Sequence, residues 1–141
     1  MHRFPYRVEG NPGIARPTVD VKLECGTGEW TTRALIDTGS PLTVFDYGTA
    51  EALGVRIGNT GHRAGMVALL GADRPVQFEY VDLTLLNAGG HSWVADVAFI
   101  KQMDFQMPFQ GILGQQGFLD RHVVTFHYYA GYLDVINIAE H

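Results

Sequence analysis

Cysteine is almost absent from this chain of 141 residues: Cys25 is the only one, so no disulfide can form within the chain. Its place in a stretch of alternating polar and apolar residues predicts a small core side chain rather than a nucleophile. Charge is also sparse, because 18% of the residues are charged, the net charge is −5, and no run of lysine or arginine occurs. We therefore expect no nucleic-acid partner, since such partners require clustered basic residues.

Long hydrophobic runs are missing as well. No stretch approaches the length that spans a bilayer, and residues 1–7 lack the apolar centre of a signal peptide. We expect a soluble, cytoplasmic protein with no membrane partner. A chain of this length with 46% apolar residues can bury one core but not two. The sequence thus predicts a single domain over residues 1–141, with its folded core at about 17–138.

Several kinds of chemistry lack their usual residues. His122 and His127 lie five positions apart, which places them on opposite faces of a strand, and no nearby cysteine or glutamate pair completes a metal site. We expect both to be surface histidines. Ser40 is followed by Pro41 and Leu42, not by the elbow of a serine hydrolase, and no glycine-rich loop with lysine could hold a phosphate. The sequence therefore predicts no metal and no organic cofactor.

Short strands separated by turns make up most of the chain. The clearest has Val19, Val21 and Leu23 alternating with polar residues, the period-two pattern of a strand with one buried face. The apolar phase slips between Tyr80 and Val81, which predicts a bulge there. The expected strands are 19–25, 30–36, 64–70, 75–85, 93–100, 123–126 and 133–138, and the expected short helices are 49–53 and 115–120. This pattern favours an all-β, closed, barrel-like domain.

Two acids interrupt apolar stretches. Asp96 lies inside the strand expected at 93–100 and needs a hydrogen-bond partner, which we interpret as structural. Asp37 directly follows the apolar residues 34–36, and the motif Asp37-Thr38-Gly39-Ser40 then leads into another apolar stretch. A carboxylate near apolar walls costs free energy unless hydrogen bonds or a shared proton compensate, and such groups concentrate at functional sites. The alternative is a plain turn, because Asp-x-Gly is a common turn signature.

The motif 35–40 and a second one, Gly111-Ile112-Leu113-Gly114 followed by Phe118-Leu119, together resemble the retropepsin-like family, the single-domain retroviral-type aspartic proteases, in its cellular and bacterial members. The order and separation of the motifs also match. Ser40 departs from the usual retroviral alanine and resembles the pepsin-like version. The resemblance implies a closed barrel-like half-domain with a flap hairpin, and an aspartic peptidase activity.

Catalysis of this type needs two carboxyls that share one proton, and the chain has one Asp-Thr-Gly. The second acid must come from another copy, so function implies a homodimer in which two copies of Asp37 activate a water that attacks a peptide substrate. By resemblance, Thr38 hydrogen-bonds across the dimer and Ser40 bonds the outer carboxylate oxygen. Gly39 lets its backbone N–H approach the acid. Simple turn capping by Thr38 and Ser40 is the alternative.

The hairpin expected over residues 64–85 is the flap candidate, and an ordinary surface hairpin is the alternative. Its tip candidates are Leu70, Gly71, Ala72, Asp73 and Arg74, which include strong turn formers.

Phe105, Met107 and Phe109 crowd a stretch with no clear period. They predict a substrate pocket that prefers large apolar side chains, with core packing as an equal alternative. Gly114 is expected to be structural, packing its backbone behind the active loop. A different class of function also fits the sequence: a catalytically inactive dimeric module that binds peptides or acts as a scaffold.

Overall fold

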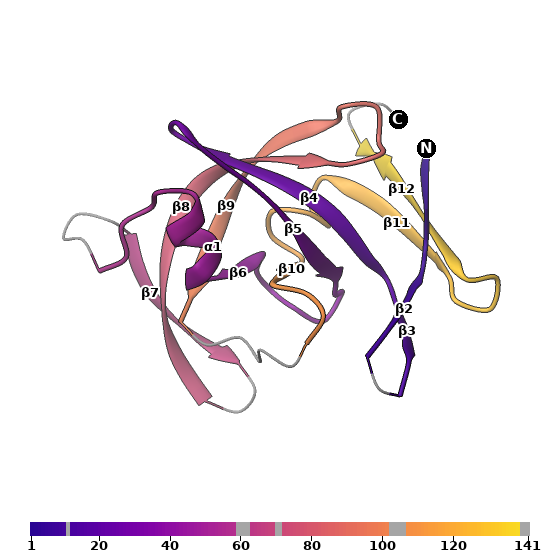
Figure 1. Cartoon of the computed structure of the whole chain (residues 1–141), viewed down its shortest axis with the longest axis horizontal. Helices are drawn as coiled ribbons and strands as arrows, with labels where there is room; N and C mark the ends of the chain where they lie inside the picture. Colours follow the sequence, from indigo (N-terminus) through magenta and orange to yellow (C-terminus); the bar gives the residue numbers. More distant parts are fainter. Residues whose placement is uncertain (11, 59–62, 70–71, 102–106, 139–141) are drawn as a thin grey trace.

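The computed structural model describes residues 1–10, 12–58, 63–69, 72–101 and 107–138. Figure 1 shows short strands, with one small helix on the left flank of the molecule. The elements before the helix are β1 (His2–Pro5), β2 (Arg7–Glu9), β3 (Ile14–Arg16), β4 (Thr18–Cys25), β5 (Gly28–Ile36) and β6 (Val44–Asp46). The remaining elements are α1 (Tyr47–Ala52), β7 (Arg63–Leu69), β8 (Ala72–Leu85), β9 (Ser92–Ile100), β10 (Gly111–Leu113), β11 (His122–His127) and β12 (Tyr132–Asn137).

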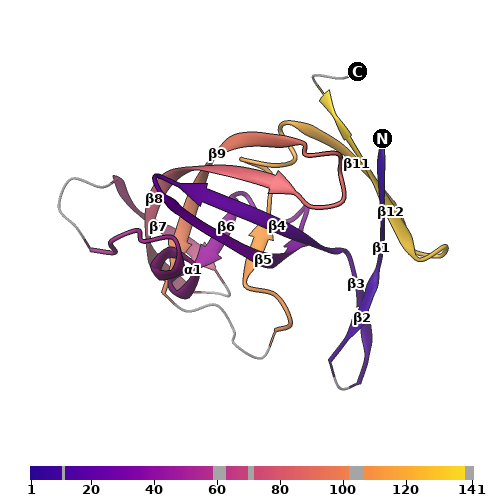
Figure 2. The same ribbon diagram turned by 45° about the horizontal axis from the view of Figure 1, so that its top comes forward.

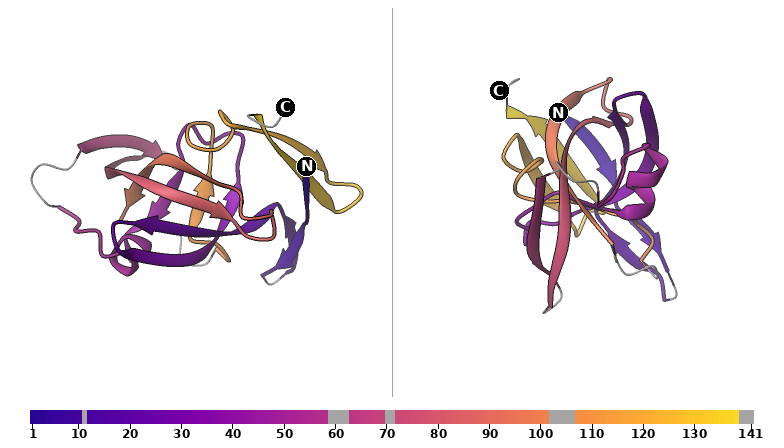
Figure 3. Two further views of the ribbon diagram at one scale, coloured as in Figure 1. Left: turned by 90° about the horizontal axis from the view of Figure 1, so that it is seen from above. Right: turned by 90° about the vertical axis from the view of Figure 1, so that its left-hand side faces the viewer.

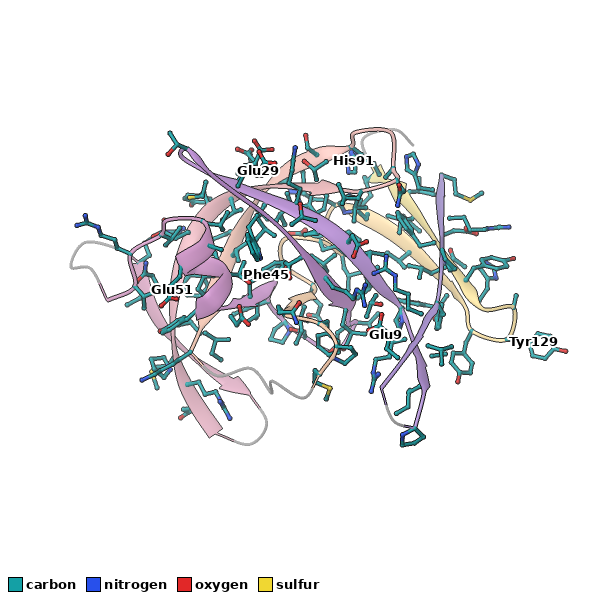
Figure 4. The ribbon with its side chains drawn as sticks, in the orientation of Figure 1. Glu9, Glu29, Phe45, Glu51, His91 and Tyr129 are labelled. Atoms are coloured by element: carbon teal, nitrogen blue, oxygen red, sulfur yellow. The ribbon has the colours of Figure 1, made fainter. Side chains whose placement is uncertain are left out.

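Six strands close into a barrel in the order β4-β5-β10-β6-β9-β8, because β8 pairs back onto β4, and β7 adds to the free part of β8. The expected all-β barrel is confirmed. The alternating pattern of β4 explains its position, since Val19, Val21 and Leu23 are fully buried in the barrel interior. Phe45 lies among them at the centre of the barrel (Figure 4).

A second apolar cluster covers another face of the same strands. Its buried members are Val44, Val76, Ala98, Ile100 and Phe109. The prediction of a bulge at Tyr80 and Val81 is wrong, because the β8–β9 ladder runs through both residues without a break. The apolar phase slips there because the first half of β8 faces the second cluster, whereas the second half faces the barrel interior.

The two ends of the chain form a separate sheet in the order β1-β12-β11, beside the barrel (Figure 3). Phe4, Leu133 and Val135 anchor this sheet in the main core. Arg3 donates two hydrogen bonds to Asp134, of 2.8 and 3.1 Å, and this pairing holds the pKa of the Asp134 carboxyl below its usual value. The link between the terminal strands therefore persists at mildly acidic pH.

Of the two expected helices, one is confirmed and the other is wrong. Helix α1 begins two residues earlier than predicted, because the Asp46 side chain caps it by accepting the Thr49 N–H at 2.8 Å. Residues 115–120 form turns instead. The N–H groups of Leu119 and Asp120 bond carbonyls five residues back, and Gly117 has a φ of 95°, so the backbone is too wide and too irregular for an α-helix. Among the described residues, no helix is long and apolar enough to cross a membrane.

The structural interpretation of Asp96 is confirmed. Arg63 reaches from β7 across β8 and donates hydrogen bonds of 2.8 and 2.6 Å to the two carboxylate oxygens. Its guanidinium also lies 4.1 Å from the centroid of the Tyr80 ring. This exposed pair links β7 to β9 across β8.

The prediction that His122 is a surface residue is wrong. Its ring is 3% exposed and stacks on Phe118, and Nδ1 lies 2.8 Å from the Phe118 carbonyl oxygen. Nε2 lies 2.8 Å from Nε2 of His91, while His127 on the same strand is only half-buried. The reason is the turn at 115–120, which folds under β11 and brings aromatic rings around His122.

Burial lowers the pKa of His122, and the nearby His91 lowers it further. Unfolded histidine takes up a proton near pH 6.5, whereas the folded ring resists protonation. Stability is therefore present above about pH 6.5 and is lost as the pH falls from there toward the lowered pKa. We expect the parent to lose more unfolding free energy between about pH 7.5 and 5 than His122→Asn, whose amide can replace Nδ1. Urea titrations at each pH measure this, with His2→Asn as the control. Equal pH dependence in the parent and His122→Asn would contradict it.

Candidate active site

Asp37 follows β5 at one end of the barrel, where the two sequence motifs meet. Strand β10 runs parallel to β5, with Ile112 opposite Leu35 and Leu113 opposite Ile36. The Asp37 N–H then continues the ladder by donating to the Leu113 carbonyl at 3.0 Å. Residues far apart in the sequence thus fix the backbone that carries the acid.

The Asp37 carboxylate is half-buried and has a backbone donor. The Gly39 N–H donates to Oδ1 at 2.9 Å, which confirms the expected approach of that glycine to the acid. A Cβ on residue 39 would lie 3.3 Å from the same oxygen, closer than ordinary contact. Leu35 and Ile112, two residues before Asp37 and Gly114, pack against the second apolar cluster. The acid therefore lies next to an apolar surface and still has one side open.

Thr38 and Ser40 differ in their surroundings. Thr38 is exposed, and its carbonyl accepts a hydrogen bond of 2.8 Å from the Gln115 side chain. Ser40 is buried. The resemblance implied a hydrogen bond from its hydroxyl to the Asp37 carboxylate, but the hydroxyl donates instead to the Leu42 carbonyl at 2.7 Å. Ser40 thus closes the loop on itself in this structure. Gln115 was missed by the sequence analysis; its only signal is its place directly after the second motif.

Gly114 has the structural role expected of it. A Cβ there would lie 2.1 Å from the Leu42 carbonyl oxygen and 2.7 Å from that of Ser40. Only glycine permits this approach, which lets the N–H of Gln115 bond the Ser40 carbonyl at 2.8 Å. The loop that follows Asp37 is therefore supported from behind by the second motif.

The flap candidate is the β7–β8 hairpin. Leu70 and Gly71 lie outside the described residues. Ala72, Asp73 and Arg74 were predicted to form the connecting turn, and this is wrong. They already belong to β8, where they pair with residues 69, 68 and 67. Strand β8 thus begins at Ala72 and not at Pro75 as expected, because the ladder tolerates polar residues on this outer hairpin. Covering of a peptide by this hairpin stays a prediction.

The three pocket candidates do not act as a set. Phe105 lies outside the described residues. Met107 is 40% exposed, whereas Phe109 is 6% exposed and packs in the second apolar cluster with Val44 and Ile100. For Phe109 the packing alternative is therefore correct. A small hollow of about 160 Å³ lies beside this cluster and is bordered by Arg74, Pro75, Ile100 and Lys101.

A hollow of about 600 Å³ lies elsewhere, between the β4–β5 turn and the end of α1, and none of the candidate site residues borders it. We place the candidate site at Asp37 because the two sequence motifs meet there and the Gly39 N–H holds its carboxylate. Within the part of the chain that the structure describes, no three His, Cys, Asp or Glu side chains are grouped to hold a metal ion.

No family model and no curated protein sequence matches this chain. Among solved structures, the chain is similar to the crystal structure of a retropepsin-like aspartic protease from Rickettsia conorii. The TM-score is 0.61 at 10% sequence identity, over 96% of this chain and 99% of that chain. At this identity the likeness shows a shared fold, and it agrees with the fold that the two motifs imply. The chemistry of Asp37 stays a prediction.

Proposed function

We propose that this chain is one half of an aspartic endopeptidase that acts as a homodimer. The observation that carries the proposal is the setting of Asp37: an open carboxylate at the end of β5, held by the Gly39 N–H and braced by β10 through Leu113. An acid serving only as a turn cap has no need of a second strand behind it. The retropepsin-like fold supports the same conclusion.

In the proposed reaction, Asp37 and its copy in the second subunit share one proton across the twofold axis. The ionised carboxylate takes a proton from water, and the water oxygen attacks the peptide carbonyl carbon. The protonated carboxyl gives its proton to the carbonyl oxygen, which yields a tetrahedral diol. Breakdown of the diol with protonation of the nitrogen releases the two peptides. Because like charges a few ångströms apart do not both ionise easily, we expect an acidic-to-neutral pH optimum.

The second apolar cluster supports a preference for large apolar side chains around the cleaved bond. Leu35 and Ile112 pack on this cluster next to the acid. Val76 on β8 belongs to the same cluster, which therefore also reaches the β7–β8 hairpin. An extended peptide between the hairpin and the acid would place alternate side chains against this apolar surface. The preference can be measured by cleavage profiling on a mixed peptide library; charged residues at the scissile positions would contradict it.

Activity is expected to depend on protein concentration, because each copy supplies half of the dyad. Below the dimer dissociation constant, specific activity should fall roughly in proportion to concentration. Sedimentation velocity over the same dilution series gives the dissociation constant independently, and a statine-type inhibitor should bind only the dimeric species. A species that sediments as a monomer and keeps full specific activity would overturn the half-site.

A further inference from the structure

The β2–β3 hairpin, which we call the arm, projects from the barrel beside the terminal sheet (Figures 1 and 2). Its two strands pair in register, with Arg7 opposite Arg16, Val8 opposite Ala15 and Glu9 opposite Ile14. Side chains of opposite residues share a face, so Val8 and Ala15 lie on one face of the arm, whereas Arg7 and Glu9 lie on the other.

The charged face of the arm attaches it to the barrel. Arg7 donates hydrogen bonds of 2.8 and 2.9 Å to the two carboxylate oxygens of Asp20 on β4. Glu9 pairs with Arg33 of β5, and in Figure 4 it lies on the side of the arm that faces the barrel. Two ion pairs, one of them bidentate, hold a hairpin in a defined direction, which a single exposed pair does not achieve. The arm is therefore a braced element.

The base of the arm lies next to the candidate active site. After β3 the chain passes through Pro17, whose carbonyl accepts the Ile36 N–H at 3.0 Å, and Ile36 is the residue directly before Asp37. In the proposed function, Asp37 meets its copy across a twofold axis within a few ångströms. An element hydrogen-bonded to the residue beside Asp37 must then lie at the edge of that contact.

The opposite face of the arm is apolar and partly exposed. Val8 is 69% exposed and Ala15 is half-buried, although the arm's other face is fixed to the barrel by ion pairs. Next to the arm, Tyr6 meets Tyr128 edge to face at a centroid distance of 5.6 Å. A single exposed valine is common on protein surfaces. Val8, however, stands on a hairpin that two ion pairs fix and that is joined through Pro17 to the residue before Asp37, so a second copy meeting at Asp37 can cover it.

We propose that the arm packs against the second copy of this chain through Val8 and Ala15, so that each subunit holds the other beside its active site. This inference rests on the proposed function, since the position of the second copy follows from the proposed contact between the two Asp37 loops. The charged side chains of the arm, Arg7, Glu9 and Arg16, share the face opposite Val8 and Ala15. Arg7 and Glu9 are paired with Asp20 and Arg33, and Arg16 bonds the Glu9 carbonyl, so these charges do not oppose the approach of an identical copy to the apolar face.

The test is the dimer dissociation constant of Val8→Glu, measured by sedimentation velocity. Placing a charge in an apolar contact that occurs twice per dimer should raise the constant on the order of tenfold or more. The control is Val94→Glu, because Val94 is 48% exposed on β9, far along that strand from its pairing with β6. It should leave the constant unchanged. Val8→Thr keeps the shape of the side chain and should weaken the dimer less, so it serves if Val8→Glu fails to fold by circular dichroism.

The outcomes separate the arm from the proposed function. A parent that is monomeric at all concentrations overturns both. A dimeric, active parent with unchanged dissociation constants for Val8→Glu and Val8→Thr overturns the arm alone. If those constants stay unchanged while KM for a peptide rises, the arm contacts substrate instead of the second copy, and the proposal is wrong.

Discussion

Asp37→Asn is expected to abolish cleavage of an unfolded protein substrate near pH 5, with kcat/KM reduced by about four orders of magnitude. Asparagine can neither take a proton from water nor share one with its copy, so both roles of the dyad disappear together. The loop should survive, because the asparagine Oδ1 can still accept the Gly39 N–H that now bonds Asp37. The variant should therefore keep the unfolding transition and the sedimentation behaviour of the parent.

The matched control for this variant is Asp82→Asn, since Asp82 is an exposed acid on β8 away from the site. It should retain full activity. Equal cleavage by the parent and Asp37→Asn would end the enzymatic proposal. A parent that dimerises and binds peptides without cleaving them would support the inactive binding module that the sequence also allows.

Gly114→Ala is expected to destabilise the protein by about 3 kcal/mol or more, because its methyl group would overlap backbone atoms that cannot rotate away. The added Cβ would lie 2.1 Å from the Leu42 carbonyl oxygen, and relief requires a shift of the loop between Asp37 and Leu42. Activity should fall along with stability, since the same shift moves the acid. Urea unfolding at one fixed protein concentration measures the loss, because the stability of a dimer depends on concentration.

Gly48→Ala is the control for added volume. Gly48 lies in α1, where a Cβ would approach no atom closer than 3.6 Å, so alanine should be neutral or stabilise by up to about 1 kcal/mol. If Gly114→Ala were as stable as the parent, the close approach of the second motif to the Asp37 loop would not be a requirement of the fold.

The pH range of the protein combines two opposing demands. In the proposed reaction the dyad is active when one of its two acids is protonated, which favours low pH. His122 is buried with a lowered pKa, so acidification below about 6.5 reduces the stability of the fold. The Asp134 carboxyl, whose pKa is lowered by Arg3, keeps the terminal strands together over the same range.

The sequence was sufficient to predict the strands with simple alternation. β4 follows its period-two pattern closely, the returning β5 ends at Ile36 as expected, and the hairpin β7–β8 was expected within three residues at each end. The approach of Gly39 to the acid and the packing role of Gly114 were also predictable, because each motif has a backbone shape that glycine permits.

The wrong predictions have a common physical cause. Each concerns a segment whose burial depends on which distant part of the chain packs over it. The change in apolar alternation at Tyr80 would require a bulge if the whole of β8 buried one face. In the structure the two halves of β8 bury opposite faces, each against its own cluster. His122 looked exposed because its cover comes from the turn at 115–120, a segment whose own good helix-forming residues hid its irregular backbone. The hydrogen bonds of the Ser40 and Gln115 side chains depend on how the two motifs pack against each other, and a local sequence pattern carries no information about that packing.

The pairing of β10 with β5 has a consequence for the newborn protein. Asp37 emerges from the ribosome early, but its backbone donor finds the Leu113 carbonyl only after most of the chain has been synthesised. Contacts between such distant segments form late in folding. A nascent chain that has reached only Ile100 therefore holds Asp37 on a loop that lacks its bond to β10, and under the proposed function such a chain would be inactive.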